Sequence, residues 1–107
     1  MFTRVVECNL KPNKTQEFTH IVREQIVPIL REQNGFVDET ILVSAHNPEE
    51  TLSISFWRTP EDAERYQREH YSRVLNLVRP LINGEPRVRS FKVQHSETHK
   101  IAAGKAA

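Results

Sequence analysis

Cysteine and glycine are scarce in this chain of 107 residues, which has one cysteine, Cys8, and three glycines. A single cysteine cannot form a disulfide within the chain, so a disulfide-stabilised scaffold is excluded and a reducing compartment is favoured. A glycine-rich phosphate loop is also missing, which disfavours a nucleotide or flavin bound in a Rossmann-type site. Neither a disulfide scaffold nor a Rossmann-type cofactor site is therefore expected.

Charge of one sign and long apolar runs are lacking too. Lysine and arginine number 15 against 14 acidic residues, and a net charge of +1 excludes the strong positive field of a dedicated nucleic-acid binder. No apolar run approaches the roughly 20 residues that span a bilayer. Arg4, Glu7 and Lys11 interrupt the N-terminal apolar residues, unlike a signal peptide. We expect a soluble, cytoplasmic protein whose partners include neither nucleic acid nor membrane.

The histidines show no spacing typical of a metal site. His20 and His46 are isolated, while His95 and His99 lie four residues apart in a polar tail without an apolar helix face. We expect no metal to be bound.

Hydrophobic periodicity predicts the elements that are present. Alternation of apolar and polar residues predicts strands over residues 2–10, 36–44, 51–57 and 86–93. Helical spacing of apolar residues predicts a first helix over about residues 15–33, interrupted by Pro28. A pair of helices begins after the N-cap Thr59, bends near His70 and is expected to end near Asn83.

The order of these elements is βαββαβ, which predicts an α+β, ferredoxin-like fold over residues 1–94 with a polar tail over 95–107. In this fold an antiparallel sheet carries its helices on one face. The other face is left open and is partly apolar, with Trp57 or Phe56 on it according to the register. Because an exposed apolar face usually marks an interface, we expect a homodimer, with two sheets packed face to face into an α/β barrel.

Reactive side chains gather where the helix pair bends. Tyr66 and His70 are four residues apart and share a helix face, and Tyr71 follows directly. A histidine can take a proton from a phenol or hydroquinone, so His70 and Tyr66 are candidate catalytic residues. The alternative is a histidine that caps backbone carbonyls at the helix joint.

Tyr71 and four other residues are candidates for contact with a substrate. Trp57 and Phe56 offer an aromatic wall, although an indole also packs well in a dimer interface. Glu7 and Asn9 share one face of the first strand, and alternation alone does not decide whether that face meets the helices or the open side.

The stretch GFVDETILVSAHNPEETLSISFWRTPEDAERYQREH resembles the antibiotic biosynthesis monooxygenase domain family of the dimeric α/β-barrel superfamily. The matching features are the Gly-Phe pair that opens a strand, the Pro-Glu-Glu turn, the Phe-Trp pair that closes the next strand, and the Thr-Pro-Glu-Asp helix start. The resemblance runs over roughly residues 2–93. The family is diverse and includes cofactor-free monooxygenases that form quinones, haem-degrading oxygenases and an isomerase of a signal molecule.

The resemblance implies a small cofactor-independent monooxygenase acting on an aromatic or quinone-type small molecule. It argues against haem degradation, since Asn76 lies near the position where the haem-degrading members carry an iron-ligating histidine. The alternatives are a non-catalytic domain that binds a small ligand, or an isomerase or decarboxylase that uses the same acid–base residues.

Overall fold

The computed structural model describes residues 1–96 and confirms the predicted α+β, ferredoxin-like fold. The strands are β1 (Phe2–Leu10), β2 (Phe36–Val43), β3 (Glu50–Trp57) and β4 (Ile82–Lys92). The helices are α1 (Thr15–Ile21), α2 (Val27–Arg31), α3 (Pro60–Glu69) and α4 (Tyr71–Val78), with a π-helical turn η1 (Val22–Ile26) and a 3₁₀ turn η2 (Arg79–Leu81). The predictions for His99 and for most of the tail concern residues outside the described part of the chain.

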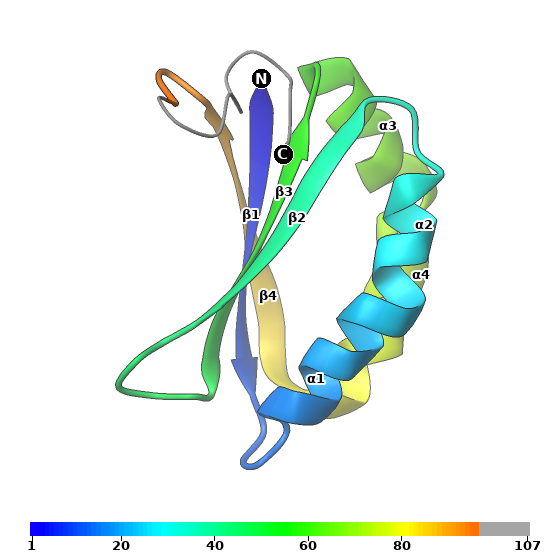
Figure 1. Cartoon of the computed structure of the whole chain (residues 1–107). Coiled ribbons are helices and arrows are strands. Elements are labelled where there is room, and N and C mark those ends of the chain that lie inside the picture. The colour runs from blue at the N-terminus through cyan, green and yellow to red at the C-terminus, as the bar shows by residue number, and fades with distance from the viewer. Residues whose placement is uncertain (97–107) are drawn as a thin grey trace.

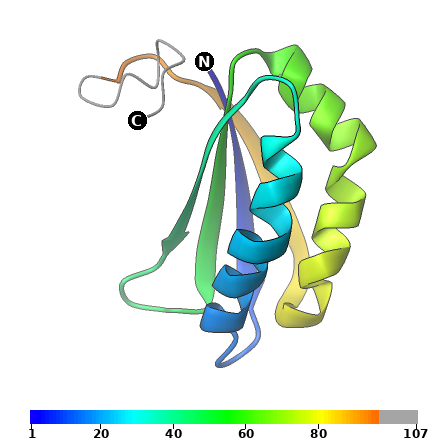
Figure 2. The same cartoon turned by 45° about the vertical axis from the view of Figure 1, so that its right-hand side comes forward.

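The four strands form one antiparallel sheet in the order β2-β3-β1-β4. Figures 1 and 2 show two helical columns, α1–η1–α2 and α3–α4, side by side over one face of the sheet. The core lies between these layers, and its largest fully buried side chains are Trp57, Leu10 and Leu30. No described element covers the opposite face of the sheet.

A β-bulge in β2 decides which of its residues face the helices. Phe36 pairs with Trp57 of β3, yet Asp38 pairs with the very next residue, Phe56, so one extra residue is inserted at Val37. An inserted residue moves every following side chain to the opposite face. Phe36, which precedes the insertion, packs edge-on against Trp57, with ring centroids 5.6 Å apart. Glu39, which follows it, faces the helices as a result of the insertion.

The first helix changes geometry just before Pro28. The backbone N–H of Val27 donates to the carbonyl of Val22, five residues back, which is the π-helical pattern. Proline lacks an N–H and clashes with the carbonyl four residues earlier, so a wider turn ahead of Pro28 relieves the clash. The predicted interruption is therefore a π-turn, and its buried residues Val22 and Ile26 face the core.

The start of α3 is fixed by its cap and by Gly35. The Thr59 side chain accepts a hydrogen bond from the backbone N–H of Asp62, at 3.1 Å. Gly35 has φ of 84°, and a Cβ placed on it would lie 2.0 Å from an oxygen of the Asp62 carboxylate. Only glycine fits between β2 and this helix start.

The predicted end of the helix pair is wrong. α4 ends at Val78, and Asn83 and Gly84 belong to β4, which begins at Ile82 rather than at Pro86. Pro80 ends the helix within η2, and Ile82 and Asn83 then pair with β1. Gly84, with φ of 73°, lies where the pairing of β1 with β4 shifts, so its positive φ serves a bulge and not a helix stop.

Candidate functional site

A cavity lies between the sheet and the two helical columns. Its volume is about 60 Å³. Most of its wall is aliphatic and comes from both columns and from β1, including Val6, Val22, Ile26, Val74, Leu75 and Val78. An apolar cavity with a few converging polar groups is the usual form of a small-molecule site.

The polar end of the cavity is one row across the sheet. Arg4 of β1 and Glu39 of β2 both pair with Ser55 of β3, so the three side chains lie side by side on the helix-facing side. Tyr66 of α3 and Tyr71 of α4 meet this row from above, and all five residues line the cavity. The strand register and the bulge at Val37 thus bring together residues that are far apart in sequence, the widest separation being the 67 residues from Arg4 to Tyr71.

Arg4 is a buried cation, 4 % exposed. Its guanidinium carbon lies 5.2 Å from the ring centre of Tyr66 and 4.8 Å from that of Tyr71, and Nη2 donates to Oε1 of Gln67. Burial lowers the pKa of Arg4 from its ordinary value, against the opposing effect of Tyr66 and Tyr71. Within residues 1–96 no carboxylate lies within 4.0 Å of Arg4, so its charge is not neutralised by an ion pair.

Glu39 carries a buried oxygen. Its Oε1 has no hydrogen-bond partner among the described residues, which is uncommon for a buried polar atom. Burial raises the pKa of Glu39 to about 8, while the positive charge of Arg4 acts against the rise and Asp38 adds to it. A carboxyl group with this pKa exchanges protons near neutral pH, as a general acid or base must.

The two tyrosines differ in their surroundings. Tyr66 is 3 % exposed and stacks on Trp57, with ring centroids 5.2 Å apart. Burial raises the pKa of both tyrosines above the ordinary value, so both stay protonated near neutral pH and can donate a hydrogen bond to a ligand. The hydroxyl of Tyr71 is buried and, like Oε1 of Glu39, has no partner in the part of the chain that the structure describes.

The cavity opens beside Glu39. A groove of about 560 Å³ runs between the first helical column and β2, an edge strand, and is lined by Thr19, Arg23, Val27, Arg31 and Phe36, among others. Val22 and Glu39 line both the groove and the cavity. Glu39 therefore stands at the mouth, between solvent and the interior.

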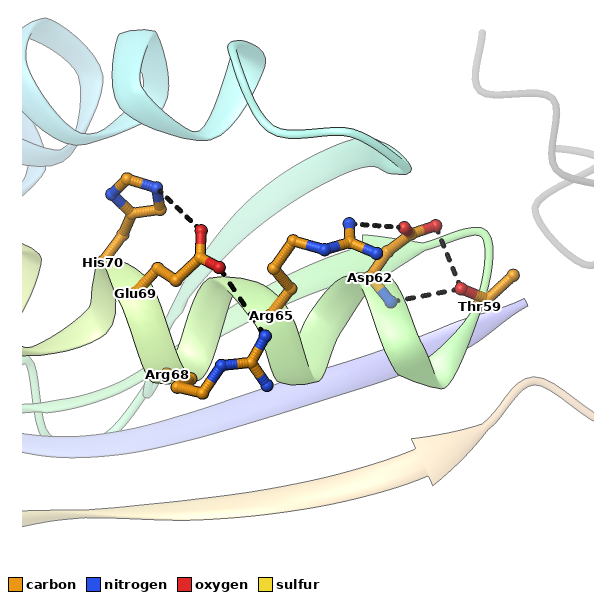
Figure 3. A network of polar contacts seen from close by, with 6 residues as sticks. All are labelled: Thr59, Asp62, Arg65, Arg68, Glu69 and His70. Carbon is orange, nitrogen blue, oxygen red and sulfur yellow. Dashed lines mark hydrogen bonds and ion pairs between the residues drawn. The ribbon is translucent and has the colours of Figure 1, made fainter.

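His70 does not line the cavity. Its ring stacks beside Tyr66, with centroids 6.4 Å apart, at the joint of α3 and α4. Figure 3 shows the carboxylate of Glu69 between His70 and Arg68, with Nε2 of His70 at 4.0 Å from Oε1 of Glu69. Nδ1 lies 3.0 Å from Nη2 of Arg73 and must accept this hydrogen bond, because a guanidinium cannot. The side chain contacts its helix neighbours, and its backbone carbonyl accepts from Val74.

Trp57 and Phe56 lie on opposite faces of β3. Trp57 is 0 % exposed, and its Nε1 donates to Oγ of Ser55 at 2.9 Å, so it supports Tyr66 from behind and does not line the cavity. Phe56 points to the open face, beside Thr3 of β1. The expected aromatic wall is supplied by Tyr66 and Tyr71.

Glu7 and Asn9 also belong to the open face. Oxygens of Glu7 lie 3.8 Å from Nε of Arg87 and 3.6 Å from Nη1 of Arg89, both on β4. Glu7 and Asn9 line a separate hollow of about 470 Å³ that also includes Arg87 and Glu50. The structure thus gathers Tyr66 and Tyr71 of the predicted residues and leaves His70, Trp57, Phe56, Glu7 and Asn9 outside the cavity.

Arg4 and Glu39 were missed by the sequence analysis. The signal for Arg4 was present, because it alternates with Phe2, Val6 and Cys8 on an otherwise apolar strand face. Glu39 carried a similar signal, although the bulge at Val37 breaks the alternation on which it depends.

Metal and membrane features are absent from the described part of the chain. No three His, Cys, Asp or Glu residues within 1–96 are grouped so that they could hold a metal ion. No described helix is both long enough and apolar enough to cross a membrane.

The fold and the cavity define the class, a small α+β protein with a mostly apolar cavity between its sheet and helices. Comparison with known families identifies the family within this class. The profile of the family described as antibiotic biosynthesis monooxygenase matches residues 1–75. The chain therefore belongs to the antibiotic biosynthesis monooxygenase family, as its strand and helix motifs indicated. No curated protein sequence matches it.

Solved structures share the fold at low sequence identity. A Nitrosomonas europaea protein named for the same monooxygenase family is 21% identical, with a TM-score of 0.73 over 89% of this chain and 100% of its own. SnoaB of Streptomyces nogalater, a cofactor-independent oxygenase, is 16% identical, with a TM-score of 0.75 over 91% of this chain and 96% of its own. A conserved protein of Methanosarcina mazei Go1 is 22% identical, with a TM-score of 0.69 over 85% and 91%.

Proposed function

We propose that this protein is a cofactor-independent monooxygenase that oxidises an aromatic or quinone-type small molecule in the cavity between sheet and helices. The observation that carries the proposal is the polar end of that cavity, where the buried cation Arg4 has no anionic partner within 4.0 Å in residues 1–96. A buried charge without a partner is costly, and an anion formed from the substrate would supply one.

The chemistry needs only an anion and dioxygen. Removal of a proton from a phenol or an activated C–H group leaves an electron-rich anion, and this anion can reduce dioxygen itself. For an activated methylene the overall reaction is R₂CH₂ + O₂ → R₂C=O + H₂O, in which the substrate supplies all the electrons. The site has to bind the substrate, take a proton and stabilise the anion, which are tasks for side chains.

The side chains divide these tasks. Tyr66 is protonated and faces the cavity, so it donates a hydrogen bond to a substrate oxygen, while the charge of Arg4 stabilises the anion. His70 touches Tyr66 and not the cavity, and we assign it as a positioning residue for Tyr66.

Oxygen uptake tests the proposed function. Purified protein is supplied with a panel of hydroquinones and phenols, and oxygen consumption above the spontaneous rate is measured. Arg4→Met removes the charge while retaining length, and we expect it to reduce turnover by about 100-fold. His70→Phe keeps a ring against Tyr66 and should retain more activity than His70→Ala. Product formation without oxygen uptake would mean that the protein is an isomerase or decarboxylase and not an oxygenase. Binding without any product would mean that it is a non-catalytic domain that binds a small ligand.

We propose further that two copies pair through the open sheet face, on which Val5, Leu52, Ile54, Phe56 and Phe91 lie. Ile54, at the centre of this face, pairs with Val5 and Thr40. Ile54→Lys should turn a dimer into the 12.5 kDa monomer in light scattering. Val88→Lys is the control, because Val88 is 40 % exposed on the other face. Wild-type protein that is monomeric at micromolar concentration contradicts the pairing.

The thiol of Cys8 is free and buried, which suits a reducing compartment, and we propose the cytoplasm as the location.

A further inference from the structure

The proposed oxygenase leaves one task unassigned, since neither tyrosine has a pKa that suits a base and His70 lies outside the cavity. We propose that Glu39 is the proton acceptor of this site, that Tyr71 donates to the oxygen on which the negative charge develops, and that the cavity takes a ligand whose apolar ring body carries a single keto or hydroxyl oxygen. This inference rests on the proposed function for its place in catalysis and deepens it.

Two buried side-chain oxygens of the cavity have no hydrogen-bond partner among the described residues. Oε1 of Glu39 and the hydroxyl of Tyr71 are buried, line the same cavity, and are the two side-chain atoms within residues 1–96 that are buried without a hydrogen bond. An unsatisfied buried polar group costs about 1–3 kcal/mol. A ligand that places a keto oxygen at the Tyr71 hydroxyl and the adjacent acidic C–H at Oε1 of Glu39 would use both groups at once.

The rest of the cavity restricts the ligand to one polar end. Away from the row of Arg4, Ser55 and Glu39 the wall is mostly apolar and comes largely from the helices, although Ser53 of β3 adds a hydroxyl on the sheet side. A second polar group of the ligand that lay against the apolar helix side chains would lose its water without gaining a partner. The cavity volume of about 60 Å³ is too small for a whole ring system. The ligand would place its polar end in the cavity and the rest of its ring past Val22 and Glu39, which also line the groove.

The charged groups around Glu39 explain how it serves as a base. Arg4 and Asp38 act on it within the sheet, Tyr66 and Tyr71 face it from α3 and α4, and Arg23 and Arg31 line the groove from the first helical column. Burial acts more strongly on the carboxylate than the cation Arg4 does, so the group gains and loses its proton near neutral pH.

The proton transfer is balanced without an oxidant. Glu39 takes a proton from the carbon next to the keto group, the C–H bond breaks, and its electron pair moves to the keto oxygen. The resulting enolate accepts a hydrogen bond from the Tyr71 hydroxyl beside the charge of Arg4. Without dioxygen the proton returns and the ketone is recovered, whereas with dioxygen the enolate is oxidised as in the overall reaction above.

Hydrogen–deuterium exchange under argon isolates this step. The probe is 2-indanone, a bicyclic apolar ketone with one oxygen and acidic C–H groups, followed by proton NMR in D₂O. We expect wild-type protein to accelerate the exchange, with a rate that rises about tenfold per pH unit below about pH 8 and levels off above it. Glu39→Gln should lose at least about 100-fold of this acceleration, and Tyr71→Phe about tenfold. Glu32→Gln, at an exposed glutamate of similar chemistry, should match wild type.

Binding is measured in parallel by the fluorescence of Trp57, which stacks against Tyr66 at the polar end. Glu39→Gln should bind 2-indanone within about threefold of wild type, because its amide also donates a hydrogen bond, and this shows that the variant is folded. Indane, which lacks the oxygen, should bind at least about tenfold more weakly than 2-indanone. Equal binding of the two, or no binding of 2-indanone, overturns the ligand class.

The outcomes separate this inference from the proposed function. A folded Glu39→Gln variant that exchanges as fast as wild type, or a wild type that binds 2-indanone without exchange, overturns Glu39 as the proton acceptor. Exchange that depends on Glu39 together with no oxygen uptake in air, from any substrate tested, sustains this inference and removes the oxygenase. Oxygen uptake that is unaffected by Glu39→Gln sustains the oxygenase and removes this inference.

Discussion

Glu39→Gln should make the protein more stable at alkaline pH and leave its stability almost unchanged in acid. The folded-state pKa of about 8 lies above the ordinary value of 4.5, so the folded state holds a proton that the unfolded chain releases. Stability from this group is therefore complete below about pH 4.5 and is lost as pH rises through about 8. Glutamine resembles the protonated carboxyl in shape and carries no charge, so the variant escapes this loss.

The magnitude follows from the difference of about 3.5 pKa units. At about 1.36 kcal/mol per unit this corresponds to about 5 kcal/mol. Glu39 is partly exposed at the groove, and screening by water reduces the figure, so we expect about 2–5 kcal/mol at pH 9. For a domain of this size that is a rise in Tm of roughly 8 °C or more over wild type.

Urea unfolding at intervals between about pH 5 and pH 9 measures the effect. The protein concentration is kept constant, because dimer formation would otherwise change the apparent stability. The difference between Glu39→Gln and wild type should grow with pH, whereas Glu32→Gln should show no such trend. A difference that is the same at pH 5 and pH 9, or that favours wild type at pH 9, refutes the assignment of a buried carboxyl at this position.

Three further predictions concern stability and reactivity. Tyr71→Phe removes a buried hydroxyl without a partner, so its Tm should equal or exceed that of wild type, and a fall of several degrees would mean that the hydroxyl is paired. Gly35→Ala should lower the free energy of unfolding by more than the roughly 1–2 kcal/mol of its positive φ, because the new Cβ meets Asp62. Gly84→Ala has open space around its Cβ and should lose only the φ cost, as urea unfolding can show. The Cys8 thiol, whose pKa burial raises to about 11, should react with iodoacetamide at pH 8 only at the rate of unfolding, and fast labelling of folded protein would contradict its burial.

Glu39 lowers the free energy of unfolding at neutral pH, and such a loss of stability is typical of a functional residue. A carboxyl that destabilises the folded state above its unfolded pKa has no structural benefit at neutral pH, and active sites commonly trade stability for such groups. Arg4 fits the same pattern, because its charge is buried beside two aromatic rings without a carboxylate within 4.0 Å in the described chain.

The sequence by itself determined the element order and the family, because these depend on local patterns. Alternation marked the strands, and Thr59 and Pro60 marked the start of α3. The α+β fold followed from the order of the elements, and the strand and turn motifs between Gly35 and His70 indicated the family that the profile match shows. Tyr66 could be chosen as a site residue because it shares a helix face with His70, four residues on, and Tyr71 because it follows His70 directly.

Only the tertiary structure decided which polar residues meet. Arg4 and Glu39 become neighbours because each pairs with Ser55, and Glu39 reaches the helix-facing side only because of the inserted residue Val37. A bulge leaves a weak trace in sequence, yet it reverses the direction of every later side chain in the strand. The sequence also left undecided which face of the sheet carries Glu7, Asn9, Phe56 and Trp57. Alternation gives each strand two faces, and only the packing of the helices decides which of them is buried.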